Sequence, residues 1–160
     1  MTIEFTLNGE PQTILIEADD NALTCLPAPF RGEGRCLDGG CGRCSIIVSG
    51  RVVPACNTPA YRLHNSEVFT VDGLETDRLY QSIRRAFEKV GLDRCREAWS
   101  AMVMLAYQIL SEVENPTEAE IQRYSRYFES RCAAREEFDR AVRLAGRVHF
   151  GRRRHGRERR

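Results

Sequence analysis

Four of the seven cysteines in this chain have a spacing that strongly limits how the surrounding segment can fold. Cys36, Cys41 and Cys44 form the pattern C-x4-C-x2-C, and Cys56 follows after eleven further residues. This arrangement is typical of plant-type [2Fe–2S] sites, in which four thiolates bind two irons. The glycines between the first three cysteines allow the backbone to approach such a cluster closely and to adopt positive φ angles. The spacing therefore predicts a loop that wraps around a metal centre.

Zinc bound by four cysteines is the main alternative, because zinc sites also use C-x2-C pairs. Zinc ribbons have two separate pairs of this kind, whereas here three cysteines lie within nine residues. Disulfide bonds are a weaker alternative. The N-terminus lacks the apolar stretch of a signal peptide, so we expect a cytoplasmic location, where cysteines stay reduced. We therefore expect one [2Fe–2S] cluster, with Cys36, Cys41, Cys44 and Cys56 as its ligands.

The first 74 residues have the pattern of a small β-rich domain. Five short segments have strand character: residues 3–7, 13–17, 45–48, 52–55 and 68–71. Asn8-Gly9 lies between the first two and is a strong signal for a β-hairpin. The cysteine loop lies in the middle of this half of the chain.

From Thr76 onward, apolar residues recur every three or four positions, which is typical of helices. Residues 99–113 are apolar almost all round, as expected for a buried helix. Thr117 and Glu120 predict a capping box at the start of the next helix. Three further helix faces are marked by apolar residues: Leu79, Tyr80, Ile83, Phe87 and Val90; Ile121, Tyr124, Tyr127 and Phe128; Phe138, Val142 and Ala145. The predicted fold class is α+β, with strands first and an antiparallel bundle of four helices second.

The net charge of +1 combines an acidic body with a basic end. Residues 152–160 contain six arginines and one glutamate, which leaves the first 151 residues with a net charge of −4. Nucleic acid is therefore not an expected partner, since the body is acidic and the tail has no aromatic residues to stack on bases. No run of about 18 apolar residues is present, so we expect no membrane insertion. Residues 149–160 are expected to form a disordered basic tail; the alternative is an arm that docks on a partner chain.

Residues 1–145 resemble the small iron–sulfur subunit of the molybdenum hydroxylases, the family of xanthine dehydrogenase and aerobic carbon monoxide dehydrogenase. The segments that match are residues 5–10, 36–56, 71–74, 102–104 and 115–121. The resemblance implies a β-grasp ferredoxin-like domain over residues 1–74 and a four-helix bundle domain over residues 75–148. It also implies larger oxidoreductase partner subunits that bind flavin, a molybdenum cofactor or both.

The helical domain departs from the family pattern. The resemblance implies a second [2Fe–2S] cluster there, whose ligand positions match Cys95, Ala98, Ser130 and Cys132. Two thiolates do not hold such a cluster, so we expect one cluster in the chain and a degenerate second site. Cys95 and Cys132 are then expected to be small buried residues of the bundle core, with a metal shared between them and nearby carboxylates as the alternative. Cys25 is expected to be structural.

These features predict the electron-transfer subunit of an oxidoreductase, without catalytic residues of its own. Its single cluster would relay one electron at a time between partner cofactors, which are flavin, molybdenum or both. Two alternatives remain open. The lost ligands favour a structural or assembly subunit with little redox role, and the isolated cysteine loop is also compatible with a stand-alone ferredoxin.

Overall fold

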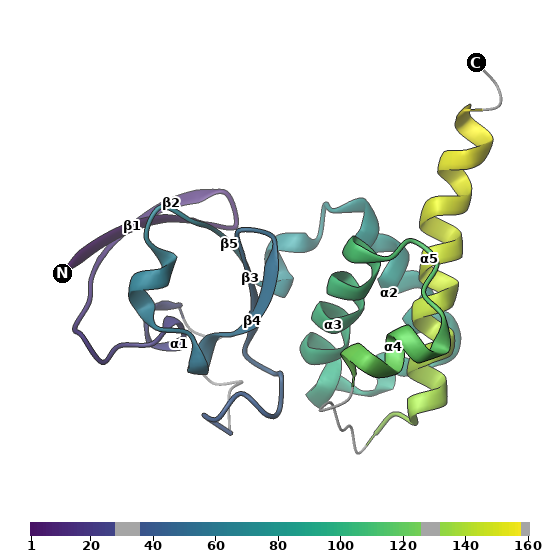
Figure 1. The fold of residues 1–160 in the computed structure, drawn as a ribbon, viewed down its shortest axis with the longest axis horizontal. Helices are drawn as coiled ribbons and strands as arrows, with labels where there is room; N and C mark the ends of the chain where they lie inside the picture. Colours follow the sequence, from purple (N-terminus) through teal and green to yellow (C-terminus); the bar gives the residue numbers. More distant parts are fainter. Residues whose placement is uncertain (28–35, 126–131, 158–160) are drawn as a thin grey trace. The chain divides into compact units, whose positions relative to one another are not determined.

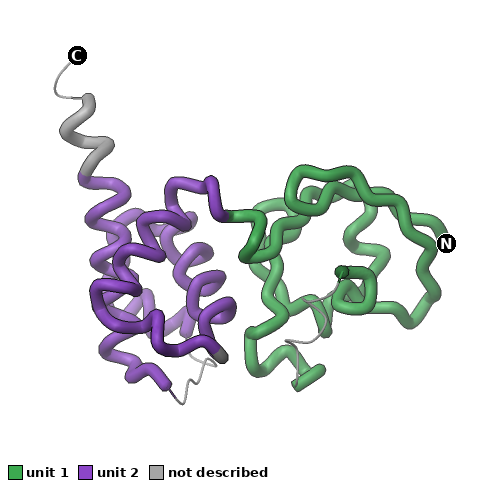
Figure 2. Tube along the Cα trace, turned by 180° about the vertical axis from the view of Figure 1, so that it is seen from behind, with its two compact units in different colours: residues 1–74 green, residues 75–160 purple. Residues whose placement is uncertain are grey.

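The computed structural model describes residues 1–27, 36–125 and 132–157. The chain divides into two compact units, Met1–Leu74 and Glu75–Arg160 (Figure 2). The first is built on a mixed sheet and the second on helices, so the fold class is α+β, as predicted (Figure 1). Two sequence features lie outside the described residues: Ser130 of the second cluster site, and the part of the third helix face that contains Tyr127 and Phe128.

The first unit contains a five-stranded sheet with the order β2-β1-β5-β3-β4. Its elements are β1 (Thr2–Leu7), β2 (Glu10–Leu15), α1 (Ala22–Cys25), β3 (Ser45–Val48), β4 (Arg51–Pro54), η2 (Ala55–Asn57), η3 (Ala60–Leu63), β5 (Glu67–Phe69) and η4 (Val71–Leu74). Strands β1 and β5 are parallel, and the other neighbours are antiparallel. The predicted hairpin is confirmed: Asn8 and Gly9 have φ angles of 53° and 87°, which suit a tight turn between antiparallel strands.

The core of this unit lies on one face of the sheet. Alternate residues of β1, Ile3, Phe5 and Leu7, are buried, as the period of two in a strand requires. They belong to the same buried cluster as Cys44 and Cys56. Two of the predicted metal ligands are therefore anchored in the hydrophobic core.

The second unit contains four α-helices in its described part: α2 (Arg78–Val90), α3 (Trp99–Glu112), α4 (Glu118–Tyr124) and α5 (Arg135–Arg157). Two short turns, η5 (Leu92–Arg94) and η6 (Arg96–Ala98), join α2 to α3. Gly91 ends α2 in a left-handed conformation with a φ of 87°. The predicted capping box at Thr117 and Glu120 is confirmed, with both of its hydrogen bonds present.

Phe87 is at the centre of the helical core. It is fully buried, and its ring makes edge contacts with Trp99 of α3 at 5.8 Å and Phe138 of α5 at 6.0 Å between ring centroids. The predicted faces of α2 and α5 are buried, with Val90 half-buried at the end of α2. Three helices thus share one aromatic contact region.

Helix α5 extends further than the sequence suggests. It continues to Arg157 and so includes most of the segment that is predicted to be a disordered tail. Phe150 is buried, and His149 makes an edge contact with it. In the described part of the chain, no helix is both long enough and apolar enough to cross a membrane.

Candidate metal centre

The pairing of β3 with β4 brings the cysteine loop close to Cys56. Cys44 directly precedes β3, and Cys56 lies in η2, two residues after β4. The two strands pair with Ser45 opposite Pro54, so the start of one lies beside the end of the other. The Ala55 N–H donates to the Cys44 carbonyl oxygen at 2.9 Å and continues this pairing beyond the sheet. Cys44 and Cys56 thereby become neighbours although eleven residues separate them.

Gly39 closes the loop against the segment that carries Cys56. Its φ is +82°, and a Cβ placed on it would lie 3.3 Å from Pro54 Cγ and 3.6 Å from Asn57 Cβ. Its backbone N–H donates to the Cys56 sulfur. A side chain at position 39 would therefore conflict with both the backbone conformation and the available space.

The pKa values of two thiols in the site shift in opposite directions. Burial on its own raises the pKa of the Cys36 thiol, but hydrogen bonds, chiefly from Cys41, outweigh it and lower that pKa. The Cys41 N–H donates to Cys36 Sγ at 3.4 Å. Burial, followed by hydrogen bonding with Cys44, raises the pKa of Cys56 to about 12. Binding of a metal at Cys56 must therefore release a proton from this thiol.

The predicted ligands form two pairs that differ in exposure. Cys44 and Cys56 are buried, whereas Cys36 and Cys41 are half-buried. Thiolate ligands with backbone N–H groups directed at their sulfurs are the donor set that iron–sulfur clusters require. Among the residues that the structure describes, no three His, Cys, Asp or Glu side chains surround a single ion. A cluster of two irons distributes its four thiolate ligands over two metal ions.

We expect Gly39→Ala to weaken retention of the cluster, because alanine strains the positive φ and its methyl group contacts Pro54. The loss of visible absorbance in air should be several-fold faster than in the parent chain. Gly50→Ala is the matched control, since Gly50 also has a positive φ, of 83°, but a Cβ added there would have no atom within 4 Å. If both variants lost the cluster at the same rate, the close contact at Gly39 would have no specific role.

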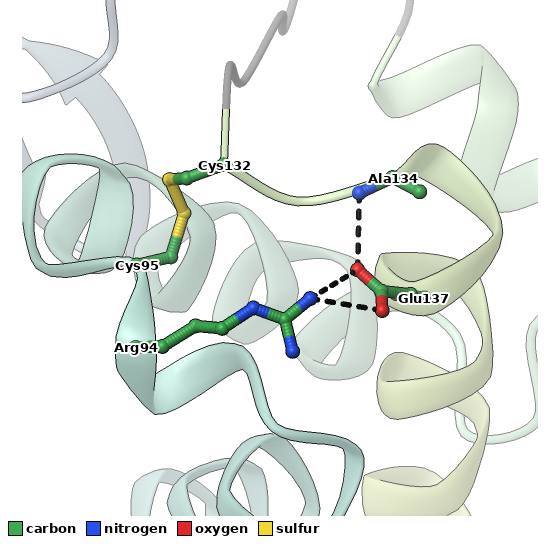
Figure 3. Close-up of polar contacts among 5 residues, drawn as sticks. All are labelled: Arg94, Cys95, Cys132, Ala134 and Glu137. Atoms are coloured by element: carbon green, nitrogen blue, oxygen red, sulfur yellow. Dashed lines mark hydrogen bonds and ion pairs between the residues drawn. A yellow bond between two sulfur atoms is a disulfide. The ribbon is translucent and has the colours of Figure 1, made fainter.

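At the second cluster site that the family pattern predicts, the two cysteines form a disulfide. Cys95 and Cys132 are bonded to each other, with their Cα atoms 5.5 Å apart (Figure 3). The expectation that both are small buried residues of the bundle core is confirmed for Cys95 and wrong for Cys132, and the disulfide contradicts the alternative of a metal held between them. Only Cys95 is buried, while Cys132 is exposed. Ala98 offers no ligand, and Ser130 lies outside the described residues, so the residues present do not fit a second cluster.

Comparison with known proteins decides the family. The chain is 30% identical over 125 residues to the nicotinate dehydrogenase small FeS subunit of Eubacterium barkeri, covering 76% of this chain and 79% of that protein. The chain belongs to the small iron–sulfur subunits of the molybdenum hydroxylases. Membership confirms the predicted class, an iron–sulfur subunit of a multi-subunit oxidoreductase.

Further known proteins match this small iron–sulfur subunit over most of its length, in sequence or in fold. One of the nicotinate dehydrogenase subunits of Pseudomonas putida is 27% identical over 150 residues, covering 90% of this chain and 94% of that one. Quinoline 2-oxidoreductase from Pseudomonas putida 86 has the same fold, with a TM-score of 0.79, 24% identity, and coverage of 94% of this chain and 97% of the matched one. Aldehyde oxidoreductase from Desulfovibrio desulfuricans matches with a TM-score of 0.81 and 22% identity over 94% of this subunit, which spans only 17% of that longer chain. No family model matches the sequence.

Proposed function

We propose that this subunit relays single electrons through one [2Fe–2S] cluster bound by Cys36, Cys41, Cys44 and Cys56. The observation that carries the proposal is the convergence of the loop on Cys56, closed by the Gly39 N–H at the Cys56 sulfur. A [2Fe–2S] cluster supplies one-electron chemistry, and the chain supplies the thiolates and the polar groups around them. It has no catalytic role of its own.

The surroundings of the four cysteines suit electron transfer. Backbone N–H groups at the sulfurs of Cys36 and Cys56 stabilise added negative charge, which favours the reduced state. Cys44 and Cys56 lie in the apolar core, which keeps water from that side of the site. Cys36 and Cys41 are half-buried, so their side of the site offers the shorter path to a partner centre.

In this proposal the sheet unit, residues 1–74, is a β-grasp ferredoxin-like domain. Residues 75–148 form a four-helix bundle domain with a degenerate second cluster site, and residues 149–160 follow it as a basic extension. The partners are larger cytoplasmic subunits that bind flavin, a molybdenum cofactor or both. Support comes from the relatives, which are named as subunits of dehydrogenases.

Anaerobic purification of the tagged chain from its own cells tests this function. We expect larger chains that contain flavin, molybdenum or both to co-purify with it. Reduction of the complex should give an electron paramagnetic resonance signal that disappears on reoxidation. A chain that purifies alone, as a monomer with a reducible cluster, would instead indicate a stand-alone ferredoxin.

A structural or assembly subunit is the second candidate. The disulfide between Cys95 and Cys132 favours it, because a covalent cross-link takes the place of a redox centre in the helical unit. This candidate predicts co-purification with the same partners but no reversible resonance signal from this chain. The purified complex therefore distinguishes the two functions.

A further inference from the structure

The Cys95–Cys132 disulfide joins two segments that are distant in sequence. Cys95 lies between η5 and η6, just before α3, and Cys132 lies three residues before α5. Their separation in sequence is 37 residues. The disulfide therefore fixes the start of the longest helix of this unit to the connection between α2 and α3.

A second link joins the same two segments (Figure 3). The Arg94 guanidinium donates to both carboxylate oxygens of Glu137, at 3.0 and 3.1 Å. The Ala134 N–H also donates to this carboxylate, at 3.1 Å. The hydrogen bond from Ala134, followed by the one from Arg94, lowers the pKa of Glu137, so the carboxylate stays ionised near neutral pH. These contacts involve neither sulfur, so the two segments have a link besides the disulfide.

The two sulfurs belong to residues of very different accessibility. Cys95 is 1% exposed, whereas Cys132 is an exposed residue. Thiol–disulfide exchange begins with attack of a thiolate on one of the two sulfurs, and access decides which one. These exposures favour attack by a thiol from solution at Cys132 rather than at Cys95.

We propose that Cys95 and Cys132 form a reversible dithiol/disulfide site for small cellular thiols, with Cys132 as the attacked residue. The thiolate of a small monothiol bonds to Cys132 Sγ, the disulfide breaks, and its electron pair leaves on Cys95 Sγ, which takes up a proton. The thiolate of a second monothiol then attacks the sulfur of the first one in the mixed disulfide and releases Cys132, which takes up the second proton. The protein gains two electrons and two protons, and the two monothiols become their disulfide.

This chemistry is separate from the proposed electron relay. Opening the disulfide to two thiols takes two electrons, whereas a [2Fe–2S] cluster exchanges one. The site therefore responds to the thiol pool around the protein and does not lie between partner cofactors. Its test can fail or succeed whether or not the cluster relays electrons.

Peptide mapping of the full chain tests reversibility without any substitution. The chain is equilibrated anaerobically in mixtures of reduced and oxidised glutathione, alkylated, and digested with a protease that cleaves after glutamate. This releases residues 89–97 and 130–136, each with one cysteine. We expect the two peptides to be linked in oxidising mixtures and separately alkylated in reducing ones, in both directions of titration. Peptides that stay linked in reduced glutathione alone, or are never linked, would overturn the proposal.

Single substitutions test which residue is attacked. Cys95→Ser leaves Cys132 as the remaining thiol of the pair, and Cys132→Ser leaves Cys95. We expect oxidised glutathione to modify Cys132 at least about tenfold faster than Cys95, because access limits the exchange. Equal rates, or faster reaction at Cys95, would contradict the assignment. Trp99, four residues from Cys95 and the only tryptophan of the chain, reports by its fluorescence whether each variant is folded. Cys25→Ser is the matched control and should form the disulfide like the parent chain.

Discussion

Cys44→Ser is expected to remove the cluster almost completely. Cys44 is fully buried in the core of the sheet unit, so no solvent or alternative side chain can readily take its place. A serine oxygen is a harder and less readily ionised ligand than a thiolate, which iron–sulfur clusters strongly prefer. Iron and acid-labile sulfide should fall from about two of each per chain to near zero. The visible absorbance and the resonance signal of the reduced state should disappear with them.

Cys25→Ser is the matched control for this variant. Cys25 is a half-buried cysteine of the same unit, and it packs against the same core without being part of the loop. It should keep the parent content of iron and sulfide. A Cys44→Ser chain that retained full iron content, or a Cys25→Ser chain that lost it, would show that the ligand set is assigned incorrectly.

Phe87→Ala is expected to destabilise the helical unit by about 3–5 kcal/mol, the range for truncating a buried phenylalanine. The phenylalanine ring contacts both Trp99 and Phe138, so its removal leaves a cavity where three helices meet. Urea unfolding followed by Trp99 fluorescence and by helical circular dichroism measures the change. Both signals should shift to lower urea concentration.

Val90→Ala is the control on the same helix. Val90 is half-buried at the end of α2, and alanine has the higher helix propensity, so the loss should stay below about 1 kcal/mol. If the two variants unfolded at the same urea concentration, Phe87 would not be the centre of the core.

Local signals in the sequence are sufficient to predict much of the fold. Asn8-Gly9 determines its own turn, and the capping box at Thr117 and Glu120 satisfies helix N–H groups within four residues. The buried faces of α2 and α5 can be predicted because apolar residues recur every three or four positions within each helix. The spacing of Cys36, Cys41, Cys44 and Cys56 similarly contains most of the information about the candidate site.

Features that depend on contacts between distant segments could not be predicted. The short helix α1 could not be predicted for another reason. Its four residues are too few to show the period of a helix, and its N-cap Asn21 gives the only local signal. The contact between Gly39 and Pro54 depends on the register of β3 and β4. The disulfide depends on the packing of α5 against the other helices. A signal for the proximity of the two residues is present in the sequence, because the family resemblance matches Cys95 and Cys132 to opposite ligand pairs of one cluster site, and such pairs lie close together.

The iron and sulfide content of the anaerobically purified full chain tests the central claim most directly. One [2Fe–2S] cluster in the sheet unit, with a disulfide in the helical unit, predicts about two irons and two acid-labile sulfides per chain. A content near four of each would show that the helical unit also binds a cluster. A content near zero, or one zinc in place of iron, would show that the four cysteines of the loop do not hold an iron–sulfur centre.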